Sequence, residues 1–157
     1  MLNKFKDKFK FNSPKNKKEI EKIKDDESNS SFFVSKLLIV DDVNVNRYVI
    51  KKYVEKFRSD IQVYEASNGL TAIELNNKNH FDLIFMDVKM PGISGIETCK
   101  RIKETDSHVV IIGSTGQVEK NVIKECLDSG MTRVLGKPID KREIEYVING
   151  GNDSVFN

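Results

Sequence analysis

The chain has 157 residues, of which 38% are apolar and 32% charged, which suits one folded domain with a full hydrophobic core. No apolar run approaches the ~20 residues of a membrane-spanning helix, and no secretory signal is visible, so we expect a cytoplasmic protein. The spacing of the two cysteines, Cys99 and Cys126, matches neither a metal site nor a disulfide framework, which favours reduced thiols inside helices.

The net charge of +2 is unevenly distributed along the chain. Residues 1–18 hold seven lysines and one aspartate, a net of +6, so the remainder must carry −4 to give the total of +2. We interpret residues 1–35 as a basic, disordered extension, because Lys, Asn, Ser, Asp and Glu dominate them. The first eleven residues also carry a weak apolar stripe that would suit an anionic membrane surface, but its shortness favours a solubilising extension.

From Lys36 onward, short apolar runs alternate with segments whose apolar residues recur at helical spacing. The runs predict five strands, at 37–40, 61–66, 83–86, 109–112 and 131–136. The helical spacing predicts five helices, over 44–57, about 70–75, 95–104, 118–127 and from the capping residue Asp140 to about Asn149. We therefore predict a single α/β domain over residues 36–149, followed by a short tail at 150–157.

Strict alternation of strands and helices demands a parallel sheet with helices on both of its faces. Five strands of this kind most often wind in the order 2-1-3-4-5, which is doubly wound. In such a sheet, ligands bind beyond the carboxyl ends of the strands, at the switch between strands 1 and 3. The sequence therefore predicts the position of a binding site as well as the fold class.

Polar side chains follow four of the five predicted strands. Asp41 and Asp42 follow the first strand, Asp87 the third, Thr115 the fourth and Lys137 the fifth. Because the carboxyl ends of parallel strands meet at one edge of a sheet, we expect these side chains to converge. Each residue alone would be an ordinary turn former, helix cap or surface residue, but their joint occurrence favours a functional site.

Three clustered carboxylates repel one another, and a divalent cation relieves the repulsion. Ligand sets made only of oxygen favour a hard ion such as Mg²⁺. A magnesium ion, a lysine and a hydroxyl group together can stabilise a transferring phosphoryl group. Asp87 follows the central strand, so it is the candidate nucleophile that would form an aspartyl phosphate.

Four segments of the chain, LLIVDD, FDLIFMDVKMPGISG, VVIIGSTG and VLGKP, together resemble the receiver domain of two-component response regulators. The resemblance covers residues 36–149, and VDDVNVNR is similar to receivers found in hybrid histidine kinases and phosphorelays. It implies a flavodoxin-like fold and a signalling phosphoacceptor that catalyses only its own phosphotransfer and dephosphorylation. Its phosphodonor would be a sensor histidine kinase or a histidine phosphotransfer protein, and its downstream partner an unknown protein.

The resemblance also implies roles for the matching residues. Asp87 would accept the phosphoryl group from a phosphohistidine. Thr115 would hydrogen-bond a phosphoryl oxygen, and Lys137, followed by a cis bond to Pro138, would pair with the phosphoryl group.

The resemblance likewise implies a magnesium site beside the phosphoacceptor. Asp42 would bind Mg²⁺ directly and Asp41 through water. Asp87 and the backbone carbonyl of Lys89 would complete the protein ligands.

The sequence departs from the receiver pattern at three places. Val134 stands where receivers often carry an aromatic residue on the fifth strand, which puts the usual signal route in doubt. Gly113, Ser114 and Gly116 predict an unusually flexible loop after the fourth strand. Lys89 brings a positive charge to the rim of the site, where it could change the lifetime of the phosphorylated state.

Two other functions compete with the phosphoacceptor hypothesis. An aspartyl-nucleophile phosphatase normally carries a second acid two residues after the nucleophile, and Lys89 occupies that position here. A degenerate receiver could serve only as an interaction module, as the absent aromatic residue would allow. No P-loop motif is present, and the basic N-terminal segment supports at most non-specific nucleic-acid binding. About eight residues follow the last predicted helix, too few for a DNA-binding module.

Overall fold

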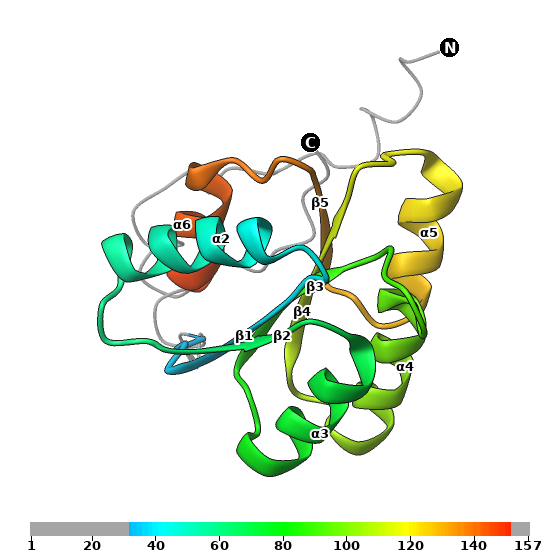
Figure 1. Cartoon of the computed structure of the whole chain (residues 1–157), viewed down its shortest axis with the longest axis horizontal. Helices are drawn as coiled ribbons and strands as arrows, with labels where there is room; N and C mark the ends of the chain where they lie inside the picture. The colour runs from blue at the N-terminus through cyan, green and yellow to red at the C-terminus, as the bar shows by residue number, and fades with distance from the viewer. Residues whose placement is uncertain (1–31, 152–157) are drawn as a thin grey trace, which may run out of the picture. The chain divides into compact units, whose positions relative to one another are not determined.

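A computed structural model describes residues 32–151, which form five strands and five helices in strict alternation (Figure 1). The elements are β1 Lys36–Val40, α2 Asn44–Phe57, β2 Gln62–Ala66, α3 Gly69–Asn79, β3 Leu83–Asp87, α4 Gly95–Thr105, β4 Val110–Thr115, α5 Lys120–Asp128, β5 Arg133–Gly136 and α6 Lys141–Ile148. The predictions of a basic extension at 1–35 and of a short tail at 150–157 concern residues that lie largely outside this range. Within it, no helix is both long and apolar enough to cross a bilayer.

The five strands form one parallel sheet in the order β2-β1-β3-β4-β5, which confirms the predicted fold class and winding. The chain moves from β1 outward to β2, and then returns past β1 to β3 before it continues to β4 and β5. This reversal creates the switch point between β1 and β3, where loops on the carboxyl side diverge in opposite directions and leave room for a ligand.

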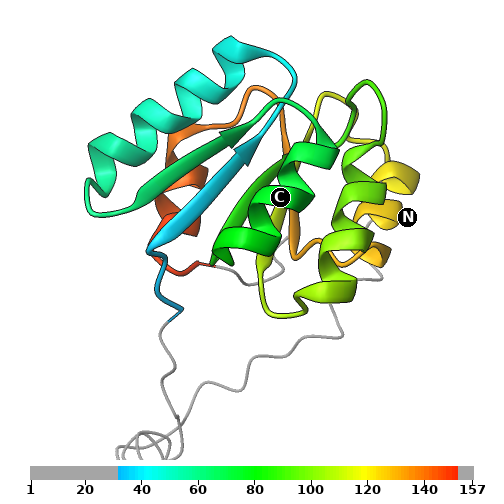
Figure 2. The same ribbon diagram turned by 60° about the horizontal axis from the view of Figure 1, so that its bottom comes forward.

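Two hydrophobic clusters lie on opposite faces of the sheet, because successive strand residues point to opposite sides. In β1, Leu37 and Ile39 belong to the cluster that includes residues of α2 and α6. Leu38 and Val40 belong to the cluster that includes residues of α3, α4 and α5. Figure 2 shows the same division, with α2 and α6 on one side of the sheet and the other three helices on the opposite side.

The two cysteines lie in the second of these clusters. Cys99 on α4 and Cys126 on α5 are fully buried and unpaired, as expected of reduced thiols inside helices. Burial raises the pKa of Cys126 to about 11, with a further contribution from Cys99. The Cys126 thiol is therefore protonated at neutral pH, and the pair behaves as ordinary core side chains.

Strand β4 is longer than the sequence analysis predicts, which corrects the interpretation of its carboxyl end. Ser114 pairs with Asp87 of β3, and Thr115 pairs with Gly136 of β5, so the sheet continues beyond the expected end at residue 112. Gly113 is therefore a strand residue and not part of a flexible loop. Its lack of a side chain has a packing reason, since a Cβ atom there would lie 2.6 Å from the sulfur of buried Met131.

Helix α3 also extends beyond the predicted segment of about 70–75. Asn76 is buried inside the extended part, where its side chain accepts from the Phe81 N–H at 3.3 Å and donates to Asp106 at 3.2 Å. The helix ends at Asn79 and is capped by His80, whose φ of 52° is left-handed. Tertiary hydrogen bonds to Asn76 thus support a polar stretch that carries no periodic apolar signal.

Asp82 organises the opposite, amino edge of the sheet. One of its carboxylate oxygens accepts hydrogen bonds from the N–H and hydroxyl of Ser35 and from the N–H of Lys36, at 2.8–2.9 Å. Val34, which precedes these residues, is fully buried in the cluster below α2 and α6. The packed part of the chain therefore includes residues ahead of Lys36, and Asp82 fixes where β1 begins.

We predict that Asp82→Ala lowers the free energy of unfolding by about 1–3 kcal/mol, because two backbone N–H groups lose a charged acceptor. Urea denaturation measures the change. Glu74→Ala, which removes an exposed carboxylate from α3, is the control and should stay within about 0.5 kcal/mol of the wild type. Equal stability of the Asp82→Ala variant and the control would show that strand pairing alone holds the start of β1.

Candidate functional site

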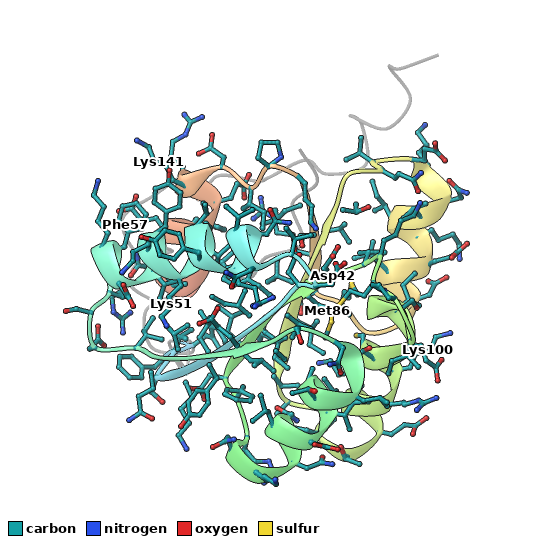
Figure 3. All side chains as sticks on the ribbon, viewed as in Figure 1. Asp42, Lys51, Phe57, Met86, Lys100 and Lys141 are labelled. Atoms are coloured by element: carbon teal, nitrogen blue, oxygen red, sulfur yellow. The ribbon has the colours of Figure 1, made fainter. Side chains whose placement is uncertain are left out.

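Three aspartates meet at the switch point of the sheet. Asp41 and Asp42 directly follow β1, and Asp87 ends the neighbouring parallel strand β3. Carboxylate oxygens of the three residues lie within 4.8 Å of one another. Asp41 and Asp87 are buried, whereas Asp42 is exposed; Figure 3 shows it at the carboxyl edge, beside the start of α2. The structure thus brings together the acids that the sequence places after strands 1 and 3.

Lys137 joins two of these acids. It follows β5, and its Nζ atom lies 2.8 Å from Asp41 Oδ2 and 2.9 Å from Asp87 Oδ1. Its backbone N–H donates to the Thr115 carbonyl at 2.8 Å, which anchors the base of the side chain to β4. The peptide bond between Lys137 and Pro138 is cis, as the resemblance to receivers implies.

Thr115 and Lys89 lie at the same edge, but their side chains do not join the acids. The Thr115 hydroxyl accepts a hydrogen bond from the Gln117 N–H at 3.0 Å. Lys89 donates its backbone N–H to Asp87 Oδ1 at 3.3 Å, while the residue is exposed to solvent. Lys89 therefore contributes to the site through its backbone, and Thr115, the last residue of β4, supplies a hydroxyl that contacts the loop after the strand.

The site carries more negative than positive charge, because three carboxylates face one ammonium group. Burial raises the pKa of Asp87 above its ordinary value; the hydrogen bond from Lys137 opposes this shift, and the charge of Asp41 adds to it. Burial by itself would lower the pKa of Lys137, but its hydrogen bonds to Asp41 and Asp87 raise it. The arrangement keeps Lys137 charged and leaves an excess of negative charge.

The donor atoms fit a hard divalent cation. The three candidate ligands offer only carboxylate oxygens, which suit Mg²⁺ or Ca²⁺ rather than soft metals. Exposed Asp42 leaves one side of the cluster accessible to water, which Mg²⁺ retains when it binds. A bound cation would also relieve the excess negative charge, so charge and ligand chemistry agree.

Asn46 and Arg47, which the sequence analysis does not assign to the site, contact Asp41 directly. The Asn46 side-chain amide donates to both carboxylate oxygens of Asp41 at 3.1 and 3.2 Å. Arg47 Nη1 donates to the Asp41 backbone carbonyl at 2.7 Å. In the sequence, these are two polar residues in the first turn of the helix that follows the acids. Polar residues are common at helix starts, so this signal alone does not assign them to the site.

Comparison with known proteins identifies the family. The profile of the response regulator receiver domain matches residues 37–149. The chain belongs to the receiver domain family of response regulators. Sporulation initiation phosphotransferase F of Bacillus subtilis is 36% identical over 113 residues, which cover 72% of this chain and 90% of that protein.

Two further relatives place this receiver in a wider group. Hybrid signal transduction histidine kinase L of Dictyostelium discoideum is 28% identical over 150 residues, covering 88% of this chain but only 9% of the kinase. A solved structure, the co-crystal of the Saccharomyces cerevisiae histidine phosphotransfer protein Ypd1 with the receiver domain of its downstream response regulator Ssk1, contains a similar chain. That similarity has a TM-score of 0.70 and 26% identity, and covers 76% of this chain and 90% of the other.

Gly95 gives this receiver a close contact between α4 and the end of β3. It is the first residue of α4, and its N–H donates to the Val88 carbonyl at 2.9 Å. A Cβ atom at this position would lie 2.0 Å from the Asp87 carbonyl oxygen and 2.9 Å from Val88 Cα. Because these neighbours are backbone atoms, only glycine lets the helix start this close to Asp87.

We predict that Gly95→Ala lowers the free energy of unfolding by about 1–3 kcal/mol, since the added methyl group must displace the backbone of β3. It should also shift the amide NMR signals of Asp87 and Val88. Gly116→Ala is the matched control, because its Cβ atom would meet nothing within 4 Å, and it should change stability by less than about 0.5 kcal/mol. Unchanged stability and spectra of the Gly95→Ala variant would contradict the packing argument.

Proposed function

We propose that this receiver is a phosphoacceptor in which Asp87 takes a phosphoryl group from a phosphohistidine with Mg²⁺ bound beside it. One observation carries the proposal: the ammonium group of Lys137 lies within hydrogen-bonding distance of both Asp41 and Asp87, at an acidic cluster on the switch point. Membership of the receiver family supports it, as does the similarity to a sporulation phosphotransferase.

The contacts of Asp87 indicate which of its oxygens reacts. Within residues 32–151, both polar contacts to its carboxylate, from Lys137 and from the Lys89 N–H, go to Oδ1. Oδ2 would therefore be the oxygen that attacks phosphorus. The new O–P bond would form as the P–N bond breaks, and the electron pair of the P–N bond would stay with the histidine nitrogen. The donor ring leaves as neutral imidazole, because its other nitrogen carries a proton.

The remaining residues hold and orient the reacting groups. Asp42 would bind Mg²⁺ directly and Asp41 through water, with Asp87 and the Lys89 carbonyl as further ligands. When bound, the cation neutralises charge on the phosphoryl oxygens. Lys137 would pair with one phosphoryl oxygen and keep the acceptor carboxylate in place.

Thr115 provides the proposed switch. After transfer, its hydroxyl would leave the Gln117 N–H and donate to a phosphoryl oxygen, which would reshape the loop between β4 and α5. Val134, partly buried against the second hydrophobic cluster, takes the place of the aromatic residue often found there. The binding surface that responds would therefore depend on the loop itself rather than on an aromatic rotamer.

The proposal also covers the chain as a whole. Residues 36–149 would form the receiver together with Val34 and Ser35, which pack at the start of β1, and a basic extension and a short tail at 150–157 would flank it. Transfer to Asp87 and hydrolysis of its phosphate would be the only reactions it catalyses, and its output would be contact with a downstream protein rather than specific nucleic-acid binding. A reducing cytoplasm suits its two unpaired thiols.

We predict that incubation with acetyl phosphate and Mg²⁺ adds one labile phosphate, detected by intact-protein mass spectrometry, and that Asp87→Asn abolishes it because an amide cannot form the anhydride. Asp60→Asn is the control; Asp60 lies away from the site, paired with Arg58 at 2.7 Å, and the variant should retain the phosphate. A phosphate retained in the Asp87→Asn variant would refute the assignment of the acceptor.

An exposed apolar face of α2 lies next to the site. Val45, Tyr48 and Val49 are all exposed, and their spacing puts them on one side of the helix. A cavity of about 140 Å³ adjoins this face, and its lining includes Val49 together with Asp41 and Lys137. We propose that the histidine phosphotransfer protein or kinase docks here, since this face adjoins the acids and a related receiver is known in complex with Ypd1.

We predict that Tyr48→Ala slows transfer from a phosphorylated histidine phosphotransfer protein about tenfold or more, because it removes an aromatic anchor from the interface. Phosphorylation by acetyl phosphate, which needs no docking surface, should be unchanged. Leu70→Ala, an exposed apolar residue on α3, is the control and should leave both rates unchanged. Equal slowing of both reactions by Tyr48→Ala would show that the residue acts on the site and not on the partner.

A further inference from the structure

Val43, which caps α2, and the first turn of the helix hold both the side chain and the main chain of Asp41. Asn46 binds the carboxylate through two hydrogen bonds, and the N–H of Val43 donates to the same carboxylate at 2.8 Å. Arg47 instead binds the backbone carbonyl of Asp41 through Nη1, at 2.7 Å. The side chain and the main chain of Asp41 are therefore fixed by different residues at the start of α2.

The guanidinium of Arg47 is held in place from two further directions. Its Nη2 atom donates to the Asn44 side chain at 3.0 Å, and its Nε atom lies 3.4 Å from Glu65 on β2. Glu65 in turn pairs with Lys51 at 3.1 Å; Figure 3 shows Lys51 further along α2. The Arg47 side chain is only 15% exposed, and Nε is buried without a hydrogen bond. Burying a charged group this far is costly unless ion pairs and hydrogen bonds compensate, and Arg47 has both.

The carbonyl that Arg47 binds belongs to the peptide bond between Asp41 and Asp42. Because a peptide unit is planar, fixing its oxygen fixes the orientation of the whole unit. On the other side, the Asp41 N–H donates to the Ala66 carbonyl at 3.2 Å. No hydrogen bond or ion pair of the exposed Asp42 side chain is found within residues 32–151. The direction in which Asp42 points therefore depends on the peptide that Arg47 holds.

We propose that Arg47 is a positioning residue of the phosphoryl-transfer site, which aims Asp42 at the cation by holding the Asp41–Asp42 peptide. The inference rests on the proposed function, and Arg47 itself does not touch the reacting atoms. A guanidinium suits this role better than an ammonium group, because its planar, fixed donors reach the Asp41 carbonyl and the Asn44 side chain together, while its charge pairs with Glu65.

Arg58 provides a matched control on the same segment. It also donates to backbone carbonyls, those of Val34 and Ile148, both at 3.3 Å, and pairs with Asp60 at 2.7 Å. These contacts lie at the other end of α2, after its last residue Phe57. Removing either guanidinium breaks the same kinds of contact, but only Arg47 holds the peptide next to a candidate ligand.

The test measures the Mg²⁺ dissociation constant of the full chain by amide NMR titration, without any phosphodonor. Arg47→Met should raise the constant about tenfold, as expected when the support of a metal ligand is lost. Arg47→Lys should raise it less, and Glu65→Gln, which loosens Arg47 without removing it, should raise it about two- to threefold. Arg58→Met should leave it unchanged despite a comparable loss of thermal stability.

Phosphorylation by acetyl phosphate separates positioning from chemistry. The rate for Arg47→Met should fall at low Mg²⁺ and approach the wild-type rate when Mg²⁺ is saturating. Magnesium affinities of Arg47→Met and Arg47→Lys within twofold of the wild type, or an equal loss in Arg58→Met, would overturn the inference. A wild-type chain that binds Mg²⁺ but takes no phosphate would overturn the proposed function instead.

Discussion

The ion pair between Lys137 and the two buried aspartates is the interaction on which the site depends. Asp41 and Asp87 lie at the ends of adjacent strands, where their charges repel each other in a poorly solvated place. The ammonium group between them reduces this repulsion and draws the fifth strand into the site. It does not neutralise the cluster, because Asp42 adds a third carboxylate. The residual negative charge suits a divalent cation at this edge of the sheet.

The sheet makes this arrangement rigid. Asp87 is the last paired residue of β3, Thr115 the last of β4, and Lys137 follows the last residue of β5. Each group is therefore held by strand hydrogen bonds rather than by a free loop. Since the site charges repel in part, a flexible support would let them move apart, and the acidic cluster would lose its fixed geometry.

Aspartate carboxylates have different roles at the two edges of the sheet. At the amino edge, Asp82 accepts hydrogen bonds from backbone N–H groups and so secures the start of β1. At the carboxyl edge, Asn46 and Arg47 satisfy Asp41, while Asp42 faces solvent. A carboxylate that accepts hydrogen bonds contributes to stability, whereas one without hydrogen-bond partners is available to a ligand.

Local patterns in the sequence were sufficient to predict the fold and which acids meet at the switch point. Apolar runs alternating with helical spacing require a parallel sheet, and the polar residues that follow the runs must then share one edge. This reasoning predicted that Asp41, Asp42, Asp87 and Lys137 converge, as they do, and placed Thr115 at the same edge. It could do so because each residue directly ends or follows a strand.

Only the tertiary structure decided the features that depend on contacts between distant segments. The carboxyl end of β4 is set by pairing with β3 and β5, which overrides the apparent flexibility of Gly113. The contacts of Asn46 and Arg47 with Asp41 depend on how α2 packs against the end of β1. The guanidinium of Arg47 also lies close to Glu65 on β2. Side-chain hydrogen bonds to backbone groups of another element leave no periodic pattern in a sequence, because their geometry exists only after the elements have packed.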